Sequence, residues 1–373
     1  MTGASNRRRF FQQCGCCETP QFKAAGLSRR ELMVSGMAAG LSALASPSAA
    51  LAQAPATTAA TPKKIIDVHH HLSAPSLLSE LRTHKLGSPP TFNWSVSKSI
   101  GDMDKAGVAT AMLSFTTPAV SSEWLGDQAR TRQLARECNE YAVQLAKDHP
   151  GRFGVFANLP MLDTEGSLAE IAYAFDVLKV DGVGILTSYG NKYLGDPLFA
   201  PILEELNRRK AVVFTHPTAG TCCRNLVADV PVQTIEFATD TTRTIASLVF
   251  SGTAARTRDI RFIFSHAGGT MPYLIERFTE LPKLNKAVAP HVPDGVMHEL
   301  SRFYYDTAQA SHPGALSSLT KLFPVSQVLF GTDFPFRTSE EHLKGLESFG
   351  LSTADLQLIE RDNALKLLPR LKG

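Results

Sequence analysis

Residues 65–71 have the sequence Ile-Ile-Asp-Val-His-His-His, in which a short apolar run leads into three histidines. An apolar run of this length, without regular polar alternation, is typical of a strand buried on both faces of a parallel sheet. Seven more runs of the same kind follow along the chain. The eight runs are Ile65–Val68, Ala109–Phe115, Phe153–Leu159, Gly182–Thr187, Ala211–Thr215, Arg261–Ser265, Phe303–Asp306 and Val328–Gly331.

The stretches between these runs have helical periodicity, most clearly in residues 130–148, 201–210 and 234–252. Eight strands that alternate with helices over residues 65–335 predict a (β/α)8 TIM barrel, a fold that typically takes about 250 residues. The main alternative is a doubly wound open sheet. We favour the barrel because no glycine-rich phosphate loop follows the first run.

Several predicted strands end in side chains that bind metals, and the carboxyl ends of the strands are where barrels of this kind place their active sites. These side chains are His69 and His71 after the first run, His216 after the fifth, His266 after the sixth and Asp333 after the eighth. In an extended segment His69 and His71 share one face, and His70 points the other way. Imidazole and carboxylate ligands suit one divalent ion, zinc first, with manganese or iron as alternatives.

Each of these residues also has an ordinary structural explanation. The histidine tract could be a turn or a surface run, His216 a buried core histidine, and Asp333 a helix cap. Their convergence on one edge of a barrel favours a metal site. The fourth run, Gly182–Thr187, ends without a lysine that could bridge a second ion, so we expect a single ion.

Residues 1–54 differ from the rest of the chain. They contain six Lys or Arg residues and two acidic residues, whereas the remainder has a net charge of −1 within the total of +3. Ser28–Met33 (Ser-Arg-Arg-Glu-Leu-Met) looks like a twin-arginine export motif, and Ala52-Gln53-Ala54 suits signal peptidase cleavage. We expect a signal peptide over residues 1–54, a linker over 55–63, a barrel over 64–373, and an exported or periplasmic protein. An uncleaved anchor and a disordered tail are the alternatives.

The nearly neutral remainder has no electrostatic footprint for nucleic acid or for an anionic membrane, so we expect neither as a partner after cleavage. Cys14, Cys16 and Cys17 in the leader stay unassigned. The other cysteines, Cys138 and the adjacent Cys222 and Cys223, are odd in number and predict no disulfide framework.

From Lys64 to the C-terminus the chain resembles the decarboxylase branch of the amidohydrolase superfamily. It is similar to the aminocarboxymuconate-semialdehyde decarboxylases and, more closely, to the 6-methylsalicylate decarboxylases. The motifs behind the resemblance are Asp67–His71, Met103–Val108, Cys138–Glu140, Val212–Phe214, His216–Thr218, Ser265–Ile275, Phe303–Asp306 and Gly331–Pro335. The resemblance implies that His69, His71, His216 and Asp333 bind the ion, and that His266 close by is a catalytic group that either does not bind the ion or binds it weakly.

One segment departs from the family pattern. The semialdehyde decarboxylases have a substrate-binding arginine shortly before the helix with their Met-Asp pair, and residues 91–98 of this chain contain none. This disfavours an aminocarboxymuconate substrate and favours an aromatic acid. We expect Arg243 to bind the substrate carboxylate in its place, with a surface arginine as the alternative. Aromatic side chains on loops could wall the pocket, or could simply pack in the core: Trp94, Tyr189, Phe334 and Phe336.

Together these features predict a carbon–carbon lyase, a metal-dependent non-oxidative decarboxylase of a small ortho-hydroxybenzoate such as 6-methylsalicylate. The ion would bind the carboxylate and the phenolate oxygen, and Asp333 or His266 would protonate the ring carbon. One alternative is a hydrolase of a lactone or amide, in which Asp333 takes a proton from water and His266 stabilises the oxyanion. A non-catalytic exported binding protein is another. Members of the family often pair through barrel helices, which is compatible with a homodimer.

Overall fold

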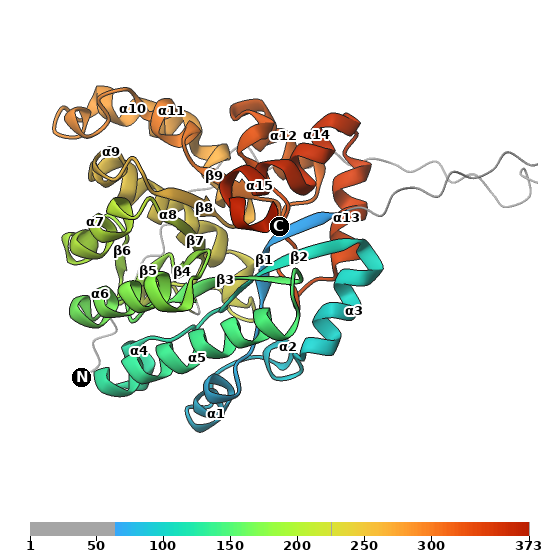
Figure 1. Cartoon of the computed structure of the whole chain (residues 1–373). Coiled ribbons are helices and arrows are strands. Elements are labelled where there is room, and N and C mark those ends of the chain that lie inside the picture. The colour runs from blue at the N-terminus through green and yellow to red at the C-terminus, as the bar shows by residue number, and fades with distance from the viewer. Residues whose placement is uncertain (1–63, 225, 373) are drawn as a thin grey trace, which may run out of the picture. The chain divides into compact units, whose positions relative to one another are not determined.

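The structure is a computed structural model that describes residues 64–224 and 226–372 (Figure 1). The expected signal peptide and linker, with Cys14, Cys16 and Cys17, lie outside the described residues. The main sheet has eight strands: β1 (Ile65–His71), β2 (Val108–Ser114), β3 (Phe153–Asn158), β4 (Gly182–Leu186), β7 (Val212–His216), β8 (Arg261–Phe264), β9 (Tyr304–Asp306) and β10 (Val328–Leu329).

The strands pair in parallel in the order β1-β2-β3-β4-β7-β8-β9-β10. The segment after β10 then bonds back to β1, because the amide of Val68 donates to the carbonyl of Phe330 (2.9 Å) and that of His71 to the carbonyl of Phe334 (2.8 Å). The sheet therefore closes into a barrel, and the predicted (β/α)8 fold is confirmed.

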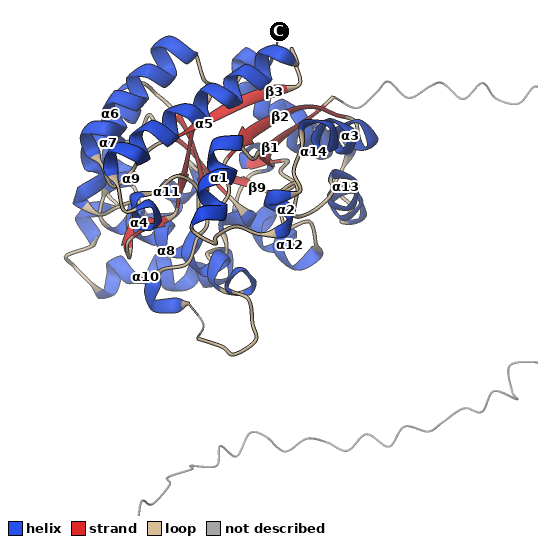
Figure 2. Cartoon of the chain, turned by 90° about the horizontal axis from the view of Figure 1, so that it is seen from below, coloured by secondary structure: helices blue, strands red, loops and turns tan. Residues whose placement is uncertain are grey.

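Helices surround the strands (Figure 2). They are α1 (Pro75–Thr83), α2 (Pro89–Phe92), α3 (Val96–Ala106), α4 (Ser122–Leu125), α5 (Gln128–Asp148), α6 (Thr164–Tyr173), α7 (Ala200–Arg208), α8 (Glu236–Phe250), α9 (Thr253–Arg256), α10 (Ile275–Leu284), α11 (Val296–Ser301), α12 (Pro313–Leu322), α13 (Ser339–Ser348), α14 (Thr353–Gln357) and α15 (Asn363–Leu367). Within residues 64–224 and 226–372, no helix combines the length and the apolar character needed to cross a membrane.

The element boundaries differ from the sequence-based prediction where side chains or partners decide them. Helix α5 begins earlier than expected because the Asp127 carboxylate caps it, accepting from the amide of Arg130 (3.0 Å). Strand β1 continues through His71 instead of stopping at Val68. No sequence pattern indicated the short antiparallel hairpin of β5 (Ser188–Tyr189) and β6 (Lys192–Tyr193).

A register shift in β1 determines which histidines face the barrel interior. Ile66 and Val68 pack in the interior cluster together with Phe214 from β7. Strict alternation would therefore place His69 on the outside. Between Asp67 and His70, however, three steps along β1 match only two steps along its partner β2, so β1 contains one extra residue here. This bulge turns His69 inward, where its ring lies 4.9 Å from that of Phe214.

Candidate metal centre and active site

Four buried side chains meet at the carboxyl ends of the strands. They are His69 and His71 at the end of β1, His216 at the end of β7, and Asp333 just after β10. One ligand-type atom from each lies within 4.8 Å of all the others. The Nε2 atoms of His69 and His71 are 3.1 Å apart, and Asp333 Oδ1 lies 3.2 and 3.0 Å from them. His216 Nε2 lies 4.0 Å from the same oxygen.

The Nδ1 atom of each of the three imidazoles contacts an oxygen atom outside this group of four side chains. His69 Nδ1 lies 2.8 Å from Asp306 Oδ2, His71 Nδ1 3.2 Å from Ser114 Oγ, and His216 Nδ1 2.9 Å from the carbonyl oxygen of Pro217. A carbonyl or carboxylate oxygen can only accept, so the proton is held on Nδ1 of His69 and His216 and the Nε2 lone pair can bind an ion. Three imidazole nitrogens and one carboxylate oxygen fit one divalent ion.

The protonation states agree with this donor set. Burial lowers the pKa of His216 to about 3 and also lowers the pKa of His71, so both rings are neutral. Burial alone would raise the pKa of Asp333, but the charge of His69 holds it well below its usual range. For His69, burial is outweighed by the carboxylates of Asp306 and Asp333, which raise its pKa to about 10. An ion must therefore displace one proton, from His69.

His266 lies beside the four side chains and is not one of them. Its backbone has φ 55°, and its amide donates to Asp306 Oδ1 (2.9 Å). Its Nε2 is buried 3.5 Å from Asp333 Oδ2 and has no hydrogen-bond partner among the residues that the structure describes. A buried, unpartnered ring nitrogen aimed at the centre can donate to or accept from a bound molecule.

Two side chains that sequence reasoning left without a role hold this arrangement in place. Asp306 at the end of β9 binds the ring of His69 through one oxygen and the amide of His266 through the other. Gln309 donates from its amide nitrogen to Asp333 Oδ2 (3.0 Å) and fixes that carboxylate. Asp306 could have been found from the sequence, since it ends a predicted strand as the other site residues do; nothing marked Gln309.

His70 points away from the centre, as expected from its position between His69 and His71, which share the opposite face. Its ring lies between Asp67 Oδ2 (3.0 Å) and Ser99 Oγ (2.7 Å) and stacks on Phe334 at 4.6 Å. Asp67 also accepts from the amide and hydroxyl of Thr332, 3.1 and 2.6 Å away. This buried group ties β1 to the segment that presents Asp333.

The structure does not bring the two expected substrate-binding residues into the ligand cluster. Arg243 on α8 has its guanidinium 3.5 Å from Glu236 Oε2 and 3.4 Å from Cys223 Sγ. Trp94 is buried before α3, and its ring nitrogen has no hydrogen-bond partner within the described part of the chain. Their roles in substrate binding stay predictions.

Aromatic rings do flank the centre. The ring of Phe336 lies edge-on to His71, 6.0 Å away, and that of Phe237 edge-on to His216, 6.1 Å away. Phe336 is 38% exposed and was among the expected pocket aromatics, whereas Phe237 was not. Two of the others have packing roles, because Phe334 stacks on His70 and the buried Tyr189 hydroxyl accepts from the amide of Leu186 (2.8 Å).

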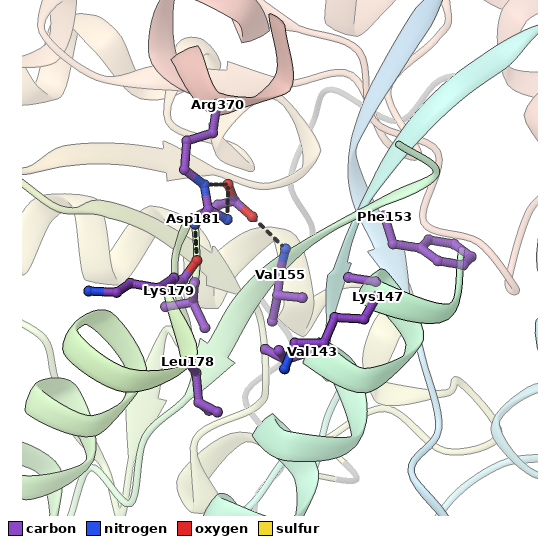
Figure 3. A pocket seen from close by; sticks show the side chains of 10 residues that line it. Val143, Lys147, Phe153, Val155, Leu178, Lys179, Asp181 and Arg370 are labelled. Carbon is purple, nitrogen blue, oxygen red and sulfur yellow. Dashed lines mark hydrogen bonds and ion pairs between the residues drawn. The ribbon is translucent and has the colours of Figure 1, made fainter. Parts of the chain in front are cut away.

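A separate pocket of about 280 Å³ lies at the amino-terminal ends of β3 and β4 (Figure 3). Arg370 reaches across it to Asp181 Oδ1 (3.0 Å), and the other oxygen of Asp181 accepts from the amide of Val155 (2.9 Å). Because His69 and His71 end β1 at the opposite edge of the barrel, this pocket is not part of the candidate active site.

A closed barrel with a histidine and aspartate metal site at its carboxyl edge defines the class of protein. The sequence model of the amidohydrolase family matches residues 66–370, and the chain belongs to that family. Among its relatives is decarboxylase yanB of Aspergillus niger, 35% identical over 82% of this chain and 87% of that protein. The 6-methylsalicylic acid decarboxylase of Penicillium expansum is also 35% identical, over 83% of this chain and 97% of that protein.

A crystal structure of dihydroxybenzoic acid decarboxylase from Polaromonas sp. JS666 superposes with a TM-score of 0.71. It is 22% identical and covers 83% of this chain and 98% of its own, so the likeness concerns the fold. That structure contains bound manganese and the inhibitor 2-nitroresorcinol. With the donor set described above, a divalent metal ion is supported for this chain.

Proposed function

We propose that this protein is a metal-dependent, non-oxidative decarboxylase of a small aromatic acid with a hydroxyl group next to its carboxylate. The central observation is the four-residue ligand set with the unpartnered Nε2 of His266 aimed at it. The relatives named as decarboxylases, one of them acting on 6-methylsalicylic acid, support this chemistry and suggest a related acid as the substrate.

We propose that His69, His71, His216 and Asp333 hold one divalent ion, with zinc as the first choice and manganese as the alternative. When bound, the ion would offset the negative charge of the substrate carboxylate and phenolate. Metal analysis of the purified protein, followed by reactivation of metal-stripped protein with each ion separately, distinguishes zinc from manganese.

Decarboxylation requires a proton at the ring carbon that bears the carboxylate. Asp333 is a poor donor because its pKa is held well below the usual range, so His266 is the better candidate. Transfer of a proton from His266 makes that ring carbon tetrahedral. The bond to the carboxylate then breaks, carbon dioxide leaves, and the bonding pair returns to the ring, which regains aromaticity. Phe237 and Phe336 are placed to hold an aromatic ring at the mouth of the site.

The test is an assay of metal-loaded protein with 6-methylsalicylate, with 2,6-dihydroxybenzoate and with a panel of lactones. For a hydroxybenzoate, we expect carbon dioxide to be released and the ultraviolet absorbance of the substrate to be lost. Hydrolysis of a lactone without release of carbon dioxide would instead establish the hydrolase alternative. No reaction with any hydroxybenzoate, in protein with a full complement of metal, would contradict the proposal.

We also propose that residues 1–54 direct export by the twin-arginine route, which transports folded proteins and would allow metal loading in the cytoplasm. The support is the sequence Ser28-Arg29-Arg30 and the cleavage motif that ends at Ala54. Replacing both arginines with lysine should leave uncleaved protein in the cytoplasm. Unchanged recovery of the processed variant outside the cytoplasm would contradict this.

A homodimer stays a prediction. Two large apolar side chains are strongly exposed near helix α10: Tyr273 lies just before the helix, and Leu284 is its last residue. They mark the first surface to substitute if light scattering shows a dimer in solution.

A further inference from the structure

Two adjacent cysteines lie in the loop between β7 and α8, on the segment that follows His216. Cys222 is exposed and Cys223 is buried, and both belong to a short 3-10 turn over Thr221–Cys223. Their Sγ atoms are 2.6 Å apart. Neither thiol belongs to the ligand set of the metal centre.

The two sulfurs are in direct contact, since their separation is shorter than that of an ordinary non-bonded pair. Unbonded heavy atoms pack at roughly 3.5–4 Å, whereas a disulfide bond is about 2.0 Å long. The two side chains therefore point at each other. We propose that Cys222 and Cys223 are a redox-active dithiol that closes to a vicinal disulfide by exchange with a small-molecule or protein disulfide.

The surroundings assign different roles to the two sulfurs. Cys222 is accessible, so it attacks the incoming disulfide. Cys223 is 8% exposed, and Arg243 Nη1 lies 3.4 Å from its Sγ. Cys223 is therefore the resolving thiol, protected from solution reagents and in contact with its neighbour.

The exchange balances in two steps. The Cys222 thiolate attacks one sulfur of the external disulfide, and the other sulfur leaves as a thiol that takes up a proton. The Cys223 thiolate then attacks Cys222 Sγ and expels the second external thiol. The two protein thiols are oxidised and the external disulfide is reduced to two thiols. The contact with Cys223 raises the pKa of the Cys222 thiol, so the first step should accelerate as the pH rises through the alkaline range.

The third cysteine of the described chain provides a matched internal control. Cys138 is fully buried on α5, and burial raises the pKa of its thiol to about 12. It should stay reduced and unreactive under conditions that oxidise the pair. The inference does not depend on the decarboxylase activity, because its readout is the covalent state of one peptide.

Trypsin isolates the pair conveniently. Cleavage after Lys210 and Arg224 releases residues 211–224, in which Cys222 and Cys223 are the only cysteines; residues 137–147 contain Cys138 alone. The full-length protein is incubated with oxidised glutathione, alkylated, denatured, digested and analysed by mass spectrometry. We expect peptide 211–224 to be lighter by two hydrogen atoms and unalkylated, and to accept two alkyl groups after reduction. Peptide 137–147 should keep a free thiol.

Two variants test the assigned order of attack. Cys223→Ser should stop at the mixed disulfide, with one glutathione on Cys222, and Cys222→Ser should leave the buried Cys223 unmodified. A wild-type pair that stops at the mixed disulfide, or that alkylates fully after the oxidising incubation, would overturn the proposal. Protection from alkylation that a chelator removes and a reductant does not would also overturn it, by showing a bound soft metal ion instead.

Discussion

The role of His266 can be tested with a substitution that its backbone accepts. With φ at 55°, this position is in the left-handed region, where asparagine is one of the better tolerated residues. The side chain of His266 makes no hydrogen bond to another described residue, and its backbone amide keeps the bond to Asp306 in any variant. His266→Asn should therefore change the free energy of unfolding by no more than about 1 kcal/mol.

The expected effect of His266→Asn on the reaction is much larger. A positioned proton donor is typically worth about 10²–10⁴ in rate, or roughly 3–5 kcal/mol of transition-state stabilisation, and an amide cannot replace it near neutral pH. Because His266 is not among the four ligands, the variant should retain its ion. Turnover of the hydroxybenzoate should fall by two to four orders of magnitude, mainly in kcat, with metal content and Tm near those of the wild type.

The assay follows release of carbon dioxide by wild-type and variant protein, with metal content measured on the same samples. His266→Gly is the companion variant, since glycine also accepts the positive φ and leaves space that added imidazole can fill to restore turnover. Loss of the ion from His266→Asn would show that His266 is a ligand. Near-wild-type turnover with the ion retained would show that it is a packing residue and that Asp333 donates the proton.

The remaining predictions concern the ion and its support. Asp333→Ala should remove one ligand, lose the ion on dialysis and abolish turnover while the barrel stays folded, as metal analysis and circular dichroism would reveal. His70→Ala should keep the ion but lower the free energy of unfolding by about 3 kcal/mol in urea denaturation, because it removes a ring stacked on Phe334 and leaves a buried polar group unpaired. Asp306→Asn should weaken metal binding by about 10–100-fold in a competition titration with a chelator, since it disturbs the hydrogen bond that orients His69. Because the pKa of His69 is about 10 without the ion, binding at pH 7 should release about one proton, and the apparent Kd should fall roughly tenfold per pH unit of increase below pH 10. Calorimetry in two buffers of different ionisation enthalpy measures that proton, and release of none would contradict the charged state assigned to His69.

Much of the architecture follows from local sequence patterns. Each predicted strand overlaps an observed one, because an apolar run of that length is typical of a strand buried on both faces wherever it lies in the barrel. Parallel strands also present their carboxyl ends at one edge, so the residues that end β1, β7 and β10 could be grouped from their positions in the chain alone. The convergence of the four candidate ligands and the family resemblance could likewise be predicted from short motifs.

The tertiary structure decided what depends on residues far apart in the chain. The bulge that turns His69 inward exists only against β2, and the carboxylate that orients its ring comes from Asp306, 237 residues later. The contact of Arg243 with Cys223 rather than with the ligand cluster depends on how the loop before α8 is placed. A sequence pattern specifies which face of an element is buried, but hydrogen-bond partners, ring orientations and pKa values arise only when distant segments share one low-dielectric interior.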